Sequence, residues 1–198
     1  MPLASKIAKA QATLADAGVA SPLVDAELIA AHILGVDRLS LRFADDFSPS
    51  QQQLFDAALH RRASREPLQH ILGTAPFGPL DLRVGPGVFI PRPETEILAD
   101  WASTFAFAEL LRRAKAHSAQ QNVTPYRIVD LCSGSGAIAC FVFDALATKI
   151  ASLPAVLAQQ LPPVEIVAVE LSPEALTYTQ ANAEQVRAQH QDSAQQDS

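Results

Sequence analysis

The sequence predicts an α/β protein with a helical bundle at its N-terminus, a β-hairpin linker and then a parallel α/β unit. Three observations carry this prediction. Apolar residues recur at helical spacing up to about residue 64, with a capping signal near each helix. From Pro67 onward, glycine and proline become frequent and the apolar runs shorten. Beyond residue 125, a strand, a glycine-rich turn, a helix and a second strand follow in the order of a β-α-β unit.

The first module is expected to contain three helices. Each has a serine before it or a glycine after it, the residues that commonly cap helices. Ser48 and Gln51 have the spacing of a capping box. The expected helices are residues 3–17, residues 22–34 and the segment after Ser48, which together make residues 1–66 a helical domain.

The third helix ends in the densest basic cluster of the chain, formed by His60, Arg61, Arg62 and Arg65. The favoured interpretation is a solvated helix end, because cations suit the negative end of the helix dipole. The alternative is a docking patch for an acidic partner surface.

Residues 67–92 are expected to form a hairpin and a proline-rich linker. The apolar runs at residues 68–72 and 80–84 are typical of two strands joined by a longer loop. The run G-P-G-V-F-I-P-R-P-E-T-E at residues 85–96 then restricts the backbone, and a helix is expected to start near Pro93. By composition this run is a stiff linker, and the alternative is a wall of a binding site.

The run R-I-V-D-L-C-S-G-S-G-A-I-A at residues 127–139 predicts a strand, a tight turn and the start of a helix. Peptide N–H groups at such a helix start point into a ligand crevice at the carboxyl end of the strand. Asp130 precedes the turn. A second strand at residues 164–169 ends at Glu170, a helix follows Ser172, and the polar tail at residues 189–198 is expected to be disordered.

Composition narrows the function classes. The net charge is −6; residues 1–116 have 12 basic and 13 acidic side chains, and residues 117–198 have 3 and 8. Direct nucleic-acid binding is therefore not expected. Two cysteines are too few for a disulfide framework and lack zinc-site spacing, which favours the cytoplasm. No membrane span or metal site is expected, and the protein is expected to be a monomer.

Two cofactor classes fit the glycine-rich turn. Gly134, Gly136 and Ala139 match a dinucleotide fingerprint, and Glu170 could then bind ribose hydroxyls. The acid in such sites follows the turn by ~20 residues, whereas Glu170 follows Gly136 by 34. Asp130 and the lack of a glycine at position 132 favour a different nucleotide-containing cofactor.

Three motifs together resemble the protein-(glutamine-N5) methyltransferases that modify peptide chain release factors. They are V-D-L-C-S-G-S-G-A-I-A, the downstream V-A-V-E-L-S-P-E-A-L with Asn182, and the upstream G-V-F-I-P-R-P-E-T-E. The helical domain is similar too, which implies that residues 1–66 recognise the substrate, and the likeness covers nearly all of residues 1–185. The I-P-R-P-E-T-E motif is the most specific of these signals and reverses the preference for a linker. The resemblance implies that residues 93–188 form a partial, Rossmann-like, S-adenosyl-L-methionine-binding domain.

The resemblance also implies roles for single residues. Asp130 borders the cofactor pocket, and Glu170 binds the ribose diol. The loop that cradles the methionine and sugar parts of S-adenosyl-L-methionine comprises Cys132, Ser133, Gly134, Ser135 and Gly136. The cleft for cofactor and substrate is lined by Arg92, Pro93, Glu94 and Thr95. The implied reaction is methylation of the glutamine amide in the Gly-Gly-Gln loop of a release factor.

The chain departs from the family in three places. It contains no N-P-P-Y, the motif that orients the amide in the family, and its sheet is expected to be incomplete, so this chain is expected to be inactive alone. Cys132 and Ser133 replace the usual Gly-Thr, and an insertion precedes Val164. The alternatives are a non-catalytic module that binds release factors, a methyltransferase for another protein or nucleic acid, and, more remotely, a nicotinamide-dependent dehydrogenase.

Overall fold

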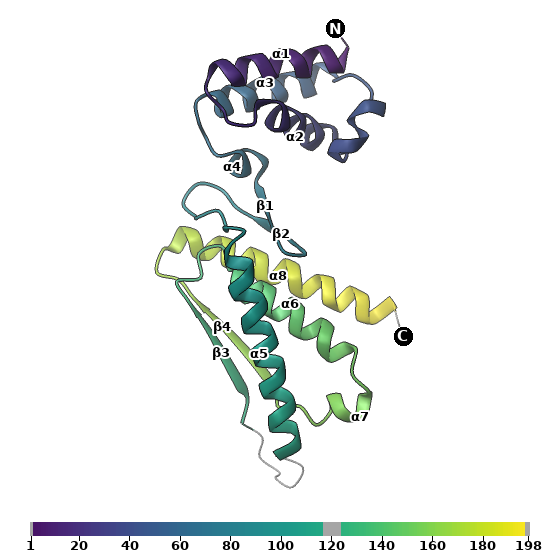
Figure 1. Ribbon diagram of the computed structural model, residues 1–198, viewed down its shortest axis with the longest axis vertical. Coiled ribbons are helices and arrows are strands. Elements are labelled where there is room, and N and C mark those ends of the chain that lie inside the picture. The colour runs from purple at the N-terminus through teal and green to yellow at the C-terminus, as the bar shows by residue number, and fades with distance from the viewer. Residues whose placement is uncertain (1, 117–123, 197–198) are drawn as a thin grey trace. The chain divides into compact units, whose positions relative to one another are not determined.

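The structure is a computed structural model that describes residues 2–116 and 124–196. It divides into two compact units, Met1–Gly73 and Thr74–Ser198 (Figure 1). The boundary falls after Gly73, later than the expected end of the helical domain at residue 66. The polar composition of residues 115–125 predicts a loop, and residues 117–123 of this segment lie outside the described residues.

Unit 1 contains the three expected helices and two short ones. The helices are α1 (Leu3–Asp16), α2 (Pro22–Leu34), the 3-10 helix η1 (Arg38–Phe43), α3 (Pro49–Ala63) and α4 (Leu68–Leu72). Gly35 ends α2 in the left-handed conformation, with φ +67°. The apolar faces of the long helices meet in one core, whose largest fully buried side chains are Leu14, Ile29 and Phe55. These three predictions of helix are confirmed.

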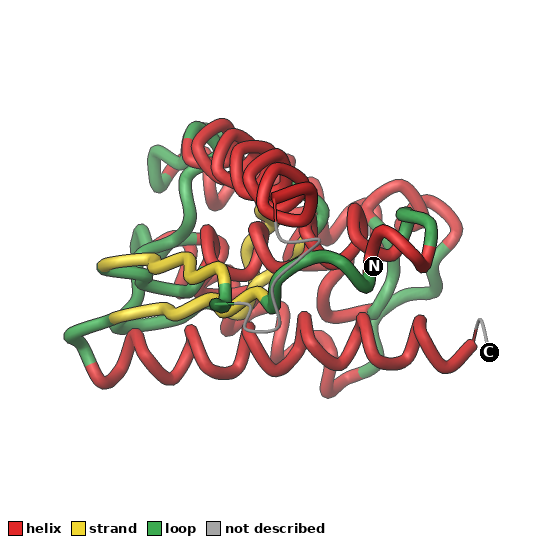
Figure 2. The backbone as a smooth tube through the Cα atoms, turned by 90° about the horizontal axis from the view of Figure 1, so that it is seen from below, coloured by secondary structure: helices red, strands yellow, loops and turns green. Residues whose placement is uncertain are grey.

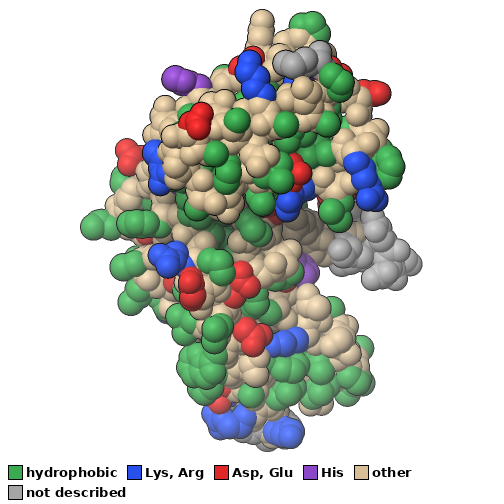
Figure 3. All heavy atoms as spheres, turned by 45° about the horizontal axis from the view of Figure 1, so that its top comes forward, with side chains coloured by type: hydrophobic (Ala, Val, Ile, Leu, Met, Phe, Trp, Pro, Cys, Tyr) green, Lys and Arg blue, Asp and Glu red, His purple; other side chains and the backbone are tan. Residues whose placement is uncertain are grey.

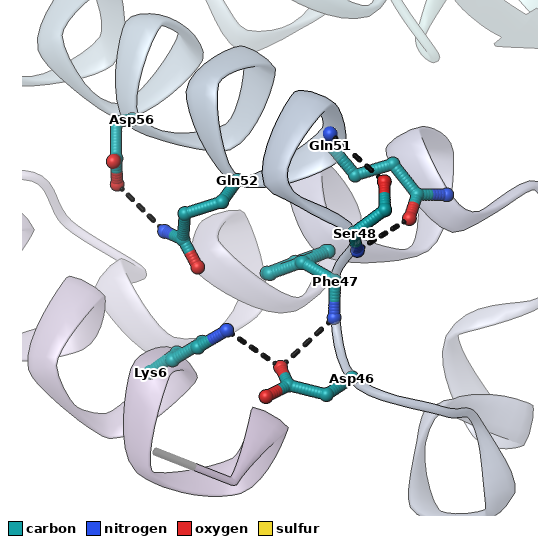
Figure 4. A network of polar contacts seen from close by, with 7 residues as sticks. All are labelled: Lys6, Asp46, Phe47, Ser48, Gln51, Gln52 and Asp56. Carbon is teal, nitrogen blue, oxygen red and sulfur yellow. Dashed lines mark hydrogen bonds and ion pairs between the residues drawn. The ribbon is translucent and has the colours of Figure 1, made fainter.

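The start of α3 is held by the expected capping box (Figure 4). The Ser48 Oγ accepts a hydrogen bond from the Gln51 N–H at 3.3 Å, and the Ser48 N–H donates to Gln51 Oε1 at 2.9 Å. Immediately before it, Asp46 Oδ1 accepts from the Phe47 N–H at 2.8 Å and from Lys6 Nζ at 2.7 Å. Lys6 belongs to α1, so this network ties the entry of α3 to the first helix.

The basic cluster at the end of α3 is engaged within unit 1. Arg62 Nε donates to Asp25 Oδ2 at 2.7 Å, with side chains that are 17% and 10% exposed. Arg61 pairs with Glu66, and Arg65 donates to the carbonyl of Gly18. The three arginines therefore join the end of α3 to other parts of unit 1. Neither interpretation of this cluster from the sequence, a solvated helix end or a docking patch, included these contacts.

The expected strand at residues 68–72 is wrong, because these residues form helix α4. The run Leu-Gln-His-Ile-Leu has apolar residues at positions one, four and five, a spacing that suits one helical turn as well as a strand. Pro67 stands at the start of this turn, and Gly73 ends it with φ +79°. Leu68 packs into the core of unit 1, so burial selects the helix.

Unit 2 contains two small sheets and four helices in its described part. They are β1 (Thr74–Phe77), β2 (Leu80–Arg83), α5 (Thr95–Ala116), β3 (Tyr126–Leu131), α6 (Ala137–Ala151), α7 (Ala155–Ala158), β4 (Val164–Val169) and α8 (Pro173–Gln196). Strands β1 and β2 form the expected hairpin, with β1 after Gly73 and antiparallel pairing of Phe77 with Leu80. Strands β3 and β4 are parallel, with Leu131 opposite Val169.

Helix α6 packs against both parallel strands and contacts α5 and α8. Figure 2 shows α5 nearly end-on and α8 running along the lower edge of the view to the C-terminus. The opposite face of the sheet is exposed at Val129, Leu131 and Val169. This arrangement is the β-α-β beginning of a Rossmann-like fold and confirms the expected α/β class.

The hairpin packs tightly on α6. A Cβ at Gly78 would lie 2.4 Å from Cε2 of Phe141, so only glycine fits at this turn without a shift. The rings of Phe77 and Phe141 meet edge to face at 5.8 Å. The hairpin is thus a fixed part of unit 2 and not a loose connection.

The prediction of a disordered tail is wrong as far as Gln196, because α8 continues to that residue. The segment lacks an apolar face, but its glutamines and its one alanine are good helix formers and extend a helix already started at Pro173. Among the described residues, no helix is long and apolar enough to cross a membrane. Acidic and basic side chains are interspersed over the face of the molecule drawn in Figure 3.

Candidate functional site

The candidate site lies at the carboxyl ends of β3 and β4. Because the strands are parallel and in register from Tyr126 to Leu131, the loops that follow them start side by side. The Ser133 N–H donates to the Val169 carbonyl at 3.0 Å, which ties the first loop to the end of β4. Such a strand edge is where open α/β sheets bind ligands.

The glycine-rich loop is a tight turn with three left-handed residues. The φ angles of Cys132, Gly134 and Gly136 are +60°, +57° and +78°. A Cβ at Gly136 would lie 3.1 Å from Cγ2 of Thr179, so the loop approaches α8 closely at this point. Cys132 adopts an angle that costs a residue with a side chain on the order of 1 kcal/mol.

The backbone N–H groups of the loop fall into two sets. Those of Ser133, Gly134 and Gly136 donate to acceptors within unit 2. Within the described part of the chain, the N–H groups of Ser135, Ala137 and Ile138 have no acceptor, and all three residues line one cleft. Unpaired N–H groups at a helix start suit an anionic group of a ligand.

Glu170 lies against this loop. Its Oε1 accepts a hydrogen bond from the Ser172 N–H at 2.9 Å, and its Oε2 accepts one from the Gly134 N–H at 2.8 Å. These two bonds hold the pKa of the Glu170 carboxyl below its usual value, so it is ionised at neutral pH. Each carboxylate oxygen has a second lone pair, which leaves acceptor sites for hydroxyl groups.

Asp130 lies at the end of β3, partly buried. Its Oδ2 accepts a hydrogen bond from the Ala139 N–H at 3.1 Å, in the first turn of α6. Burial raises the pKa of the Asp130 carboxyl, and this hydrogen bond offsets the rise in part. Nearby, burial raises the pKa of the Cys140 thiol to about 11, which makes it unreactive, whereas Cys132 is an exposed free thiol at the cleft.

The proline-rich segment forms the facing wall. A cleft of about 470 Å³ lies between this segment, the glycine-rich loop and the start of α8. Its residues on the wall side are Gly87, Phe89, Ile90, Pro91, Arg92 and Thr95. The expectation that this segment walls the site, rather than serving only as a linker, agrees with this geometry.

The structure brings together most of the residues expected at the site. Six of the seven expected cofactor residues line the cleft, and they are Asp130, Cys132, Ser133, Gly134, Ser135 and Glu170. Gly136 lies behind the loop, against Thr179. Of the expected substrate residues, Arg92 and Thr95 line the cleft, whereas Pro93 and Glu94 are exposed and do not.

Two polar residues of α8 were not expected to take part in the site. Thr179 and Asn182 are 5% and 0% exposed and hydrogen-bond to the glycine-rich loop. Nothing in the sequence around Thr179 indicates this contact, although Asn182 is part of the downstream motif. No group of three or more potential metal ligands occurs within residues 2–116 and 124–196.

Comparison with known proteins points to one family. Residues 6–73 match a family model described as the PrmC N-terminal domain. The chain is 48% identical over 196 residues to the release factor glutamine methyltransferase of Corynebacterium glutamicum, covering 96% of this chain and 59% of that protein. The proteins of the same name from Mycolicibacterium smegmatis and Streptomyces coelicolor are 48% and 44% identical, over 91% and 92% of this chain. The chain spans 54% of the length of each of these two.

Proposed function

Because this chain belongs to the release factor glutamine methyltransferase family, we propose that its cleft binds S-adenosyl-L-methionine, the methyl donor with which such an enzyme methylates a peptide chain release factor. The acceptor is the side-chain amide of the glutamine in the release factor's Gly-Gly-Gln loop. The observation that carries this proposal is the meeting of the glycine-rich loop, Glu170 and the proline-rich segment around one cleft.

The chemistry of the cleft supports this cofactor. S-adenosyl-L-methionine has a carboxylate, two positive groups and a ribose diol. The N–H groups of Ser135, Ala137 and Ile138 suit the carboxylate, and the remaining lone pairs of Glu170 suit the diol. Asp130 adds negative charge to the lining of the cleft, which suits the two positive groups.

The reaction transfers a methyl group from sulfur to nitrogen. The carbon–sulfur bond breaks as the carbon–nitrogen bond forms, S-adenosylhomocysteine leaves, and the amide nitrogen gives up one proton to solvent. An amide nitrogen is a weak nucleophile, because its lone pair is delocalised. Catalysis therefore depends on holding nitrogen, carbon and sulfur in line and on hydrogen bonds that orient the amide. Residues 1–198 contain no N-P-P-Y to provide those bonds, so we propose that these residues by themselves bind the cofactor without turnover.

Unit 1 is proposed to recognise the release factor. Its support is an exposed apolar pair on η1, where Leu39 and Phe43 are 82% and 78% exposed and Arg42 lies over the Phe43 ring at 4.6 Å. Replacing Leu39 and Phe43 with serine in the full chain should abolish capture of a purified release factor. Leu54→Ser, on α3 and 60% exposed, is the control. If the variant with serine at positions 39 and 43 captured as much release factor as Leu54→Ser, a role of η1 in recognition would be contradicted.

Two measurements on the 198-residue chain test the proposed function. Titration calorimetry should show saturable binding of S-adenosyl-L-methionine with one site per chain. Incubation with methyl-labelled S-adenosyl-L-methionine and a release factor should leave the release factor unlabelled. Absence of binding contradicts the cofactor proposal, and label on the glutamine contradicts the proposal that this chain does not turn over.

A further inference from the structure

The glycine-rich loop is held from behind by two buried polar side chains of α8. Thr179 and Asn182 are three residues apart, so they lie on one face of the helix. Neither residue lines the cleft itself. Their hydrogen-bond partners are carbonyl groups of the loop and the backbone of the hairpin. The Thr179 Oγ1 also has two longer contacts of 3.4 Å, one with the Ser133 hydroxyl and one with the Ala175 carbonyl of α8 itself.

Thr179 binds the carbonyl of Gly134. Its Oγ1 donates to that oxygen at 2.7 Å. In a trans peptide the C=O and N–H groups point in opposite directions. A Gly134 carbonyl directed at α8 therefore directs the N–H of Ser135 away from α8. Ser135 lines the cleft, and its N–H has no acceptor within the described part of the chain.

Asn182 joins the loop to the hairpin. Its Nδ2 donates to the Ser135 carbonyl at 2.8 Å and to the Arg83 carbonyl at 3.0 Å. Its Oδ1 accepts from the Arg83 N–H at 2.7 Å. Both amide donors and the acceptor are thus used at a site with no exposure to solvent. Arg83 ends β2, and the wall of the cleft begins four residues later at Gly87.

We infer that Thr179 and Asn182 are positioning residues of the cofactor cleft, an inference that rests on the proposed function. Thr179 sets the orientation of the peptide between Gly134 and Ser135, so that one N–H is presented to the ligand before the ligand arrives. Asn182 fixes the distance between the loop and the wall, because its side chain binds the backbone of Ser135 in the loop and of Arg83 just before the wall. Neither residue touches the ligand, so both act through the backbone that they hold.

Thr179→Val is the primary test, because valine keeps the shape of threonine and removes only the hydroxyl. Thr179→Ser retains the hydroxyl, so its amide exchange and its ligand affinity should equal those of the wild type. Gln185→Ala is the matched control, since Gln185 lies on the same helix and donates to the hairpin carbonyl of Asp81 at 3.0 Å without contacting the loop. Asn182→Ala removes three buried hydrogen bonds and can unfold unit 2, so it serves as a secondary variant.

Two readouts separate positioning from a contribution to stability alone. Amide hydrogen exchange in the absence of ligand should be faster at Gly136, whose N–H donates to the Ser133 carbonyl at 2.8 Å within the loop, in Thr179→Val. It should be unchanged at that site in Thr179→Ser and Gln185→Ala. Calorimetry with S-adenosylhomocysteine should show about tenfold weaker binding by Thr179→Val, the change expected from losing one oriented hydrogen bond. Both experiments are run well below the unfolding temperature of every variant.

The outcomes distinguish this inference from the proposed function. Exchange at Gly136 that is equally fast in Thr179→Val and Gln185→Ala overturns the positioning role, whether or not the ligand binds. Binding by Thr179→Val as tight as by the wild type overturns it as well. If the wild type binds no S-adenosylhomocysteine but exchange at Gly136 is still faster in Thr179→Val, the proposed function is contradicted and the positioning of the loop is supported.

Discussion

The carboxylate of Glu170 accepts a hydrogen bond from the backbone N–H of Gly134, with 2.8 Å between Oε2 and the nitrogen. The two residues are 36 positions apart and meet because β3 and β4 end side by side. The contact places an ionised acid directly against the glycine-rich loop. Glu170 therefore has two functions in this account, since it holds the loop and also offers acceptor sites to a ribose.

Glu170→Gln separates these two functions when two ligands are compared. The variant should bind S-adenosylhomocysteine about tenfold more weakly than the wild type, because a charged acceptor is lost. For the analogue without ribose hydroxyls the loss should be smaller, because only the effect on the loop remains. Calorimetry with both ligands measures the difference, and Glu165→Gln, which removes the same charge from β4, the strand that Glu170 follows, is the control. Equal losses for both ligands would exclude a ribose contact.

Cys132→Gly should stabilise the protein. Cys132 has a φ of +60°, an angle at which glycine carries no steric cost. Part of the gain is lost because glycine has more freedom in the unfolded chain, so the expected increase in the free energy of unfolding is about 0.5 to 1 kcal/mol. Urea unfolding measures it. Ser133→Gly, at a neighbouring position without a positive φ, should show no gain, and an equal gain there would contradict the strain at Cys132.

Asp130 should make folding less favourable as the pH rises. Its pKa is raised in the folded state, so the folded protein holds this proton more tightly than the unfolded chain does. The resulting stability is present below the unfolded pKa and is lost as the pH rises through the folded pKa. Asp130→Asn keeps an acceptor for the Ala139 N–H and removes this dependence. The stability of the variant relative to wild type should increase from about pH 3 to about pH 7 in urea unfolding.

The opposite trend is expected for Glu170. Its pKa is lowered by the hydrogen bonds from Ser172 and Gly134, so its contribution to stability is present above the unfolded pKa and is lost as the pH falls through the folded pKa. The loss in free energy of unfolding caused by Glu170→Gln should therefore be smaller in acid than at neutral pH. If Asp130→Asn and Glu170→Gln showed the same trend with pH, the assignment of the two carboxylates would be contradicted.

Arg62→Ala should destabilise unit 1 strongly. The substitution leaves Asp25, which is 7% exposed, without its cationic partner, and an uncompensated buried charge costs about 3 kcal/mol. Arg38→Ala removes the more exposed pair with Glu27 in the same unit and should cost less than about 1 kcal/mol. Urea unfolding of the whole protein, followed by far-ultraviolet circular dichroism, compares the losses in free energy of unfolding of the two variants. Similar losses would contradict a special role for the Arg62–Asp25 pair.

Local signals in the sequence predicted much of the fold. Capping residues act within one turn of the helix that they cap. The end of α2 at Gly35 and the start of α3 at Ser48 therefore follow from nearby residues. The failures were at segments whose state depends on distant packing. Residues 68–72 are helical because Leu68 reaches the core of unit 1, and the last turns of α8 continue a helix that starts at Pro173.

The candidate site was predictable where its residues follow strands. Asp130 and Glu170 stand at strand ends, and parallel pairing brings such positions together. The contacts of Asn182 with Arg83 were not predictable, because the two residues are 99 positions apart and an asparagine in a helix has many other possible partners. The same holds for Arg62 and Asp25, which are 37 positions apart. Long-range polar pairs are specified by the whole fold.

Titration with S-adenosylhomocysteine, followed by nuclear magnetic resonance of the backbone amides, tests whether this cleft is the cofactor site. We expect saturable shifts of the Ser135, Ala137 and Ile138 N–H signals, because these groups line the cleft and have no acceptor within the described part of the protein. The signals of α1, which belongs to unit 1, should stay in place. No shifts in the glycine-rich loop at saturating ligand, or shifts confined to unit 1, would contradict the assignment of this cleft.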